Sequence, residues 1–137
     1  MTPDMSEIYF CAATGGYAQA VICVMRWEEG RWSEPEVAPF SGHRGWMDLE
    51  PFITPDGGRL FFLSNRPDAG EEDGDQDIWV VDREGDGWSE PRNLGAPVNT
   101  AASEYFPAVT RDGTLYFTRS DSNRVHRIYR SQPGPSG

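Results

Sequence analysis

Short apolar runs recur along the chain, and turn residues precede each one. The runs EIYFCA, RLFFLS and TLYFTR occupy residues 7–12, 59–64 and 114–119. Their apolar residues are consecutive rather than alternating, which indicates β-strands that are covered on both faces. Each run follows a Thr-Pro-Asp or Thr-Arg-Asp sequence, and such sequences favour tight turns. We therefore expect three copies of one turn-and-strand unit.

Longer segments also repeat, at a spacing of 56 residues. VICVMRWEEGRWSEP at residues 21–35 aligns with DIWVVDREGDGWSEP at 77–91, and DLEPFITPDG at 48–57 aligns with EYFPAVTRDG at 104–113. A period of about fifty residues with strand-like content favours a solenoid or a propeller over a single irregular domain. Each unit is predicted to contain four short antiparallel strands.

The tetrapeptide WSEP closes two of these units, at residues 32–35 and 88–91. Its proline cannot donate to a β-ladder, so we predict that this fourth strand lies at an outer edge. Four strands with buried middle strands and a proline-bearing edge are typical of a propeller blade between two neighbours. The predicted fold class is all-β, a partial β-propeller of about two and a half to three four-stranded antiparallel blades.

The repeat also predicts the organisation of the chain. Residues 1–47 form a first blade without its innermost strand, 48–103 a complete second blade, 104–131 a third blade without its outermost strand, and 132–137 a flexible tail. Closed propellers usually contain 4–8 blades. We expect copies to associate head to tail, so that a two-fold pair closes a ring of six blades. The alternative is an excised piece of a longer propeller.

Charge and composition exclude some partners. The net charge is −10 and the pI is near 4.5, which argues against nucleic acid or an anionic membrane surface as the main partner. No apolar run approaches the roughly 20 residues that span a bilayer, so no membrane insertion is expected. The N-terminal sequence MTPDMSEIYF has no basic region before an apolar core, so no signal peptide is predicted.

The repeats resemble a known family, the WD40-like (PD40, TolB-type) β-propeller repeats of bacterial envelope proteins. The resemblance covers nearly the whole chain and is strongest from about residue 48 to 131. The matching elements are Pro55-Asp56-Gly57, Ser64-Asn65-Arg66-Pro67, Asp77-Ile78-Trp79, Asn93-Leu94-Gly95 with Pro97 and Asn99, and Glu104 ahead of Pro107. The resemblance implies a module that binds a protein or peptide partner, or assembles, in the periplasm or at the cell surface.

An acidic segment at residues 68–77 is a candidate metal site. Asp73, Asp75 and Asp77 have the alternating spacing by which carboxylates converge on Ca²⁺, a cation that prefers oxygen ligands. The segment departs from the EF-hand pattern, because its sixth position is Ile78 rather than glycine. The alternative is a solvated acidic loop. No cofactor other than Ca²⁺ is expected.

Two acids, Asp48 and Glu104, occupy equivalent positions at the start of the predicted innermost strands. An acidic ring near one mouth of a propeller channel could bind a cation or a basic peptide. Alternatively, each carboxylate accepts hydrogen bonds from the adjoining backbone. Arg66 is predicted to pair with one of these acids or with a carboxylate of a ligand.

Trp46 has no counterpart in the other repeats. It lies in a predicted loop that leads into an inner strand, where propellers present binding surface. With His43 and Arg44 it is a candidate contact for a partner or a sugar, and the alternative is an aromatic side chain that only caps the fold.

Catalytic motifs are missing from the sequence. There is no G-x-S-x-G elbow, and His43 and His126 stand far apart without a motif around either. Cys11 and Cys23 flank a predicted hairpin turn, where they form either a disulfide or two buried free thiols. The expected function is a non-catalytic module for binding and assembly. The alternatives are a fragment of a propeller enzyme, or an accessory domain, acting on polysaccharide or peptide, and a purely structural ring subunit.

Overall fold

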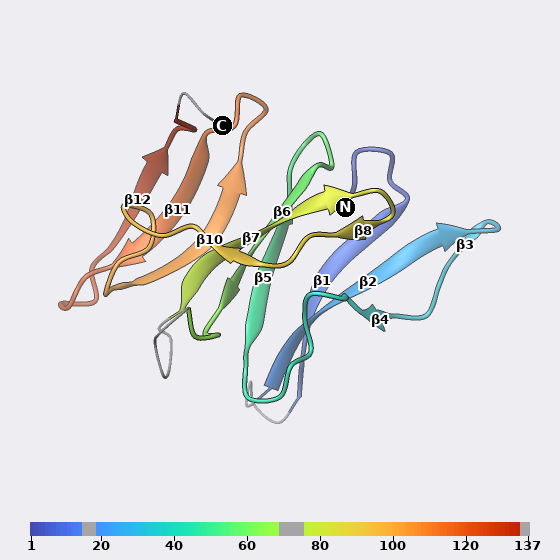
Figure 1. Ribbon diagram of the computed structural model, residues 1–137, viewed down its shortest axis with the longest axis horizontal. Coiled ribbons are helices and arrows are strands. Elements are labelled where there is room, and N and C mark those ends of the chain that lie inside the picture. The colour runs from blue at the N-terminus through green and yellow to red at the C-terminus, as the bar shows by residue number, and fades with distance from the viewer. Residues whose placement is uncertain (15–18, 69–75, 135–137) are drawn as a thin grey trace.

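The computed structural model describes residues 1–14, 19–68 and 76–134, and in these residues the protein is all-β (Figure 1). The strands form three antiparallel sheets that follow one another along the chain. This confirms the predicted all-β class. Within the described residues no helix is long and apolar enough to cross a membrane.

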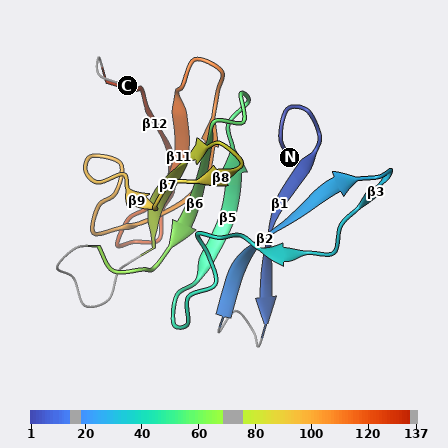
Figure 2. The ribbon, with the colours of Figure 1, turned by 45° about the vertical axis from the view of Figure 1, so that its right-hand side comes forward.

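Each sheet is built from strands that are consecutive in the sequence, and the sheets pack face to face (Figures 1 and 2). The first sheet contains β1 (Glu7–Thr14), β2 (Gln19–Glu28), β3 (Arg31–Trp32) and β4 (Glu36–Val37). The second contains β5 (Asp48–Ile53), β6 (Arg59–Ser64), β7 (Asp77–Glu84), β8 (Gly87–Trp88) and β9 (Arg92–Asn93). The third contains β10 (Ser103–Val109), β11 (Leu115–Ser120) and β12 (His126–Ser131).

One turn structure precedes the second strand of each repeat. In the second repeat, the hydroxyl of Thr54 donates to Oδ1 of Asp56 at 2.6 Å, and the same oxygen accepts the amide of Gly58 at 2.9 Å. The amide of Arg59 donates to Oγ1 of Thr54 at 3.0 Å. These short-range bonds stabilise the turn before β6, because side-chain oxygens accept backbone amides that have no backbone partner in the turn.

The two bonds to the aspartate recur in the other two repeats. Thr2 donates to Asp4 at 2.7 Å, and Thr110 donates to Asp112 at 2.5 Å. Each of these aspartates also accepts a backbone amide two residues further along the chain. Turns therefore form at all three positions where the sequence predicted them.

The two WSEP segments form an interrupted edge strand. The amide of Ser33 donates to the carbonyl of Arg26 at 2.8 Å, and Oγ of Ser33 accepts the amide of Arg26 at 3.0 Å. Ser89 makes the same two bonds to Asp82. The serine hydroxyl thus replaces a backbone acceptor, and the edge divides into two short strands on either side of the Ser-Glu-Pro sequence.

Two apolar clusters join the three sheets. Sheets one and two share a core that includes Ile22, Val24, Phe62 and Trp79. Sheets two and three share a second core that includes Phe61, Leu63, Ile78 and Val80 from the middle sheet. Residues 60–63 are consecutive and alternate between the two cores. This arrangement explains the unbroken apolar run in β6, since both faces of the middle sheet are covered.

Candidate functional site

Asp48, the first residue of β5, lies in a buried polar centre. Its carboxylate accepts the hydroxyls of Ser41 at 2.7 Å and Ser64 at 2.6 Å, and Nη2 of Arg66 donates to its Oδ1 at 2.7 Å. Arg66 also donates to Oγ of Ser64 at 2.9 Å and to the carbonyl of Phe40 at 3.0 Å. Asp48 therefore has a full set of partners within the chain.

Aromatic rings surround the guanidinium of Arg66. Its central carbon lies 5.1 Å from the ring centroid of Trp46, 5.0 Å from that of Phe62 and 5.4 Å from that of Trp79. The ring of His43 stacks on Trp46 with centroids 3.8 Å apart. Cation–π attraction is strengthened where water is excluded, so these rings help to hold the buried cation. The structure thus brings together three of the predicted binding residues, Trp46, Asp48 and Arg66.

Glu104 lies in a separate centre at the start of β10. Its carboxylate accepts the hydroxyl of Thr100 at 2.6 Å and Nε of Arg119 at 2.8 Å. Nη2 of Arg119 donates in addition to the carbonyls of Pro97 at 2.9 Å and Val98 at 2.7 Å. Glu104 is fully buried, so this ion pair removes the cost of an isolated buried carboxylate.

The two centres share one design. In each, an acid at the start of the first strand of its sheet pairs with an arginine that also donates to carbonyls of the loop leading into that strand. Arg66 was predicted to pair either with one of the two acids or with a carboxylate of a ligand. It pairs with Asp48. Both carboxylates are engaged inside their own sheets. A role in binding for these two acids stays a prediction.

The predicted Ca²⁺ ligands lie only partly within the described residues. Asp73 and Asp75 fall outside them, while Asp77 begins β7 and accepts Nδ2 of Asn93 at 2.8 Å. Across the residues that the structure describes, no group of three or more histidine, cysteine or acidic side chains is arranged to hold a metal ion. The Ca²⁺ site stays a prediction.

The strands β5 and β10, each the first strand of its sheet, lie beside each other, and each carries a β-bulge. The bulge residues Glu50 and Phe106 have positive φ angles of 51° and 55°, and both precede a proline. Oε2 of Glu50 accepts the amide of Phe106 at 2.6 Å. Burial raises the pKa of Glu50, while the bond from the Phe106 amide lowers it. Strained bulges of this kind cluster at binding sites.

Phe106 itself projects into solvent, with 66% of its surface exposed. It packs edge to face against Tyr105, whose hydroxyl lies 3.0 Å from Nδ1 of His126. An exposed aromatic side chain on a strained backbone is costly for folding alone. This group on β10 therefore forms an exposed aromatic surface whose side chains are held by local contacts.

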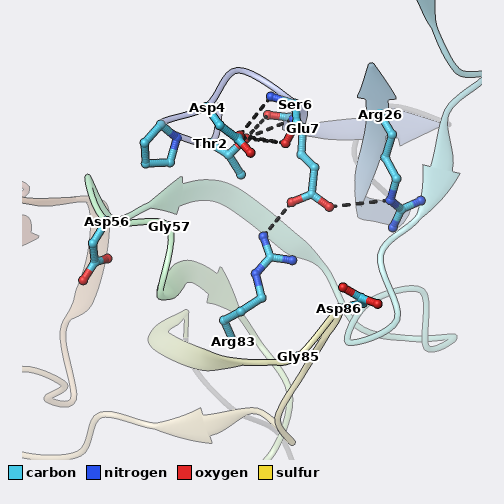
Figure 3. A pocket seen from close by; sticks show the side chains of 11 residues that line it. Thr2, Asp4, Ser6, Glu7, Arg26, Asp56, Gly57, Arg83, Gly85 and Asp86 are labelled. Carbon is cyan, nitrogen blue, oxygen red and sulfur yellow. Dashed lines mark hydrogen bonds and ion pairs between the residues drawn. The ribbon is translucent and has the colours of Figure 1, made fainter. Parts of the chain in front are cut away.

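A pocket of about 560 Å³ opens between the first two sheets, beside the repeated turns (Figure 3). Glu7 links two strands across it: Oε2 accepts Nη2 of Arg83 at 2.5 Å, and Oε1 lies 3.5 Å from Nε of Arg26. The guanidinium of Arg83 stacks 4.1 Å from the ring centroid of Trp88. Glu7 and the two arginines neutralise one another, so the pocket contains an ion pair that links the two sheets.

The two cysteines are free thiols, which decides between the two sequence alternatives. In the β1–β2 register, Cys11 is opposite Ile22 and Cys23 is opposite Phe10. The two sulfurs therefore point to opposite faces of the sheet. Burial raises the pKa of both thiols, which makes them poor nucleophiles at neutral pH.

Sequence reasoning missed Arg119, Glu50 and Phe106. The repeat held a signal for the last two, because each stands before a proline at the same repeat position. Arg119 had no comparable signal, since the equivalent residue in β6 is Ser64, which lies opposite Asp48 as Arg119 lies opposite Glu104.

Comparisons with protein-family models, with curated proteins and with solved structures find no match to this chain.

Proposed function

We propose that this chain is a partial β-propeller of TolB-type repeats, two and a half to three blades long, which acts as a non-catalytic module for binding and assembly. The observation that carries the proposal is the threefold repetition of one turn, Thr-x-Asp, at the same edge of three stacked sheets. Stacked, equivalent four-stranded units with an interrupted outer edge are the building plan of propellers.

Binding is supported by the surface beside the inner strands. Phe106 and Tyr105 present aromatic area there on a backbone whose position Glu50 fixes. Rigid aromatic side chains make effective anchors for a partner, because little conformational entropy is lost when they are covered. The net charge of −10 attracts basic partners and repels acidic ones. A basic peptide with apolar side chains is the ligand class that these features favour.

A non-catalytic role is supported by the ion pairs that the buried acidic groups form. Asp48 and Glu104 are neutralised by arginines that also bind backbone carbonyls, so their chemistry is structural. Glu7 is held between two arginines. General acid–base catalysis needs a group that can reach a substrate with a tuned proton affinity. Asp48 and Glu104 are instead engaged within their own sheets, and Glu7 links the first sheet to the second.

Isothermal titration calorimetry with two matched peptides tests the binding proposal. One probe is a ten-residue peptide of alternating lysine and leucine, and the other has glutamate in place of lysine. We expect the basic peptide to bind at least about tenfold more tightly, and Phe106→Ser to weaken it by a similar factor.

Met5→Ser is the matched control, because Met5 is another apolar side chain that is 66% exposed. It is expected to leave binding unchanged. Absence of heat with either peptide, or equal losses in the two variants, would contradict the proposal.

A further inference from the structure

The first sheet has one covered face and one open face. Residues paired in register lie on the same face, so Tyr9 and Val24 share the face that packs on the second sheet. The opposite face, which we call the N-terminal face, is largely apolar, with Gln19 at one end, and is covered by no sheet of the described chain. Its apolar residues are Ile8, Phe10, Ala12, Val21, Cys23, Met25, Trp27, Trp32 and Val37.

The repeat shows what kind of surface covers such a face. In the second sheet the equivalent face contains Leu60, Phe62 and Trp79, and the first sheet packs on it. At that junction Nε1 of Trp88 donates to the hydroxyl of Tyr9 at 3.1 Å. Trp32 stands in the N-terminal face where Trp88 stands in the covered one. The N-terminal face is thus built to receive another sheet with an aromatic hydroxyl at the position of Tyr9.

The third sheet presents such a surface. Its outward side, which we call the C-terminal face, carries Tyr116 where the first sheet has Tyr9, and Ile128 where it has Ile22. Ile128 is 78% exposed, although Ile22 and the equivalent Ile78 are completely buried. Two side chains that are core residues in the other repeats are therefore open to solvent here.

Charge distribution agrees with a contact between these two faces. On β12 of the third sheet, Arg130 lies opposite Tyr116 and therefore on the C-terminal face, whereas Arg127 lies on the other face and pairs with Asp121 at 2.9 Å. The outer part of the first sheet carries Glu28, Glu29 and Glu34, together with Glu36, which pairs with Arg26 at 3.0 Å. An arginine on the C-terminal face and glutamates beside the N-terminal face favour one relative orientation and suppress a contact between two identical faces.

We propose that two copies of this chain associate head to tail, the C-terminal face of each packing on the N-terminal face of the other. This inference rests on the assembly part of the proposed function and names its surfaces. Two such contacts related by a two-fold axis close the pair. Across each contact, Nε1 of Trp32 donates to the hydroxyl of the other copy's Tyr116, as Trp88 does to Tyr9 within one chain.

Sedimentation equilibrium on the whole chain tests this arrangement. The protein is expected to show twice the monomer mass of 15.3 kDa. Ile128→Glu and Trp27→Glu each place a charge in the contact, and each is expected to weaken dimerisation by at least about thirtyfold. Tyr116→Phe removes one hydrogen bond and is expected to weaken it about fivefold. Ile128 and Trp27 are exposed in the single chain, so these variants should fold.

Met5→Glu is the control, since it places the same charge at an exposed apolar position outside both faces, and it should leave the mass unchanged. A monomer at all concentrations would overturn the inference. A dimer that resists Ile128→Glu would overturn it in favour of two N-terminal faces in contact, and long polymers would overturn the closed pair. If a monomer binds the peptide, the binding part of the proposed function stands and only the assembly is contradicted. If a dimer forms but binds no peptide, only the proposed ligand is contradicted.

Discussion

Arg66 donates to Asp48 at 2.7 Å in a site where the two side chains are only 6% and 1% exposed. Removing one partner of a buried ion pair leaves an uncompensated charge, which typically costs about 3–5 kcal/mol. We therefore expect Asp48→Asn to lower the free energy of unfolding by about that amount, as measured by urea denaturation followed through tryptophan fluorescence.

Asp82→Asn is the matched control for this variant. Asp82 also pairs with arginines, at 2.8 Å from Arg59 and 3.2 Å from Arg92, but all three side chains are partly exposed. Exposed pairs contribute about 0–1 kcal/mol. A loss in Asp48→Asn no larger than the loss in Asp82→Asn would contradict the structural role of the buried centre.

The first of the three repeated turns contains a methionine where the others contain glycine. Met5 has a φ of 57°, and the equivalent Gly57 and Gly113 have φ of 73° and 84°. Side chains are strained in this region, so Met5→Gly should stabilise the protein by about 0.5–1 kcal/mol. Gly57→Ala should destabilise it by at least about 1 kcal/mol, because its Cβ would also lie 3.2 Å from Cδ of Pro3. Thermal unfolding measures both, and shifts of the same sign would refute the assignment.

The aspartates of the repeated turns should make stability depend on acidity. Hydrogen bonds from Thr2 and Ser6 lower the pKa of Asp4 from 3.8 to about 2, and hydrogen bonds also lower the pKa of Asp56 and Asp112. A lowered pKa contributes stability that is present above the unfolded value and is lost as the pH falls through the folded one. Unfolding free energy should therefore drop between about pH 4 and pH 2.

Replacing all three aspartates by asparagine should remove most of that drop and lower stability at neutral pH. Urea denaturation at several pH values provides the comparison. An unchanged slope in the triple variant would mean that these turns do not carry the acid sensitivity.

Glu50 should behave in the opposite sense. Burial raises its pKa, so the neutral form is favoured in the fold. The stability that this group contributes is present below its unfolded pKa and is lost as the pH rises through the folded pKa. Glu50→Gln keeps an acceptor for the amide of Phe106 without the charge.

We therefore expect Glu50→Gln to be more stable than the parent protein at pH 7, with the advantage disappearing below about pH 4. Denaturation curves at the two pH values measure it. A variant that is less stable at pH 7 would indicate that the charge of Glu50 has a favourable partner.

The parts of the fold that could be predicted depend on contacts close in sequence. The turn at Thr54 and Asp56 depends on a short stretch of consecutive residues, and it forms as expected. The division of the edge strand at Ser33 was missed, because it depends on the Ser33 hydroxyl accepting a backbone amide seven residues away. The bond from Phe106 to Glu50 joins residues 56 apart, and no local pattern marks it.

One ion pair of the candidate site could be predicted from the sequence, and the other could not. Pairing of Arg66 with an inner-strand acid could be predicted from the repeat, since Asp48 and Glu104 align. The partner of Glu104 could not, because Arg119 stands opposite it on the neighbouring strand where the other repeat has Ser64 opposite Asp48. Ser64 and Arg119 occupy equivalent positions but differ in type. Only the strand register shows that both bind the acid at the start of the neighbouring strand.

The bond between Glu50 and Phe106 also bears on how the chain can be shortened. The bulge of β10 obtains an acceptor for its amide from a side chain of the preceding sheet. A truncation between residues 103 and 104 follows the sequence repeat but separates these partners. Folding of the third sheet is therefore tied to that of its neighbour, as in arrays whose stability resides at the contacts between units. For protein engineering, the smallest useful cassette is two adjoining repeats rather than one.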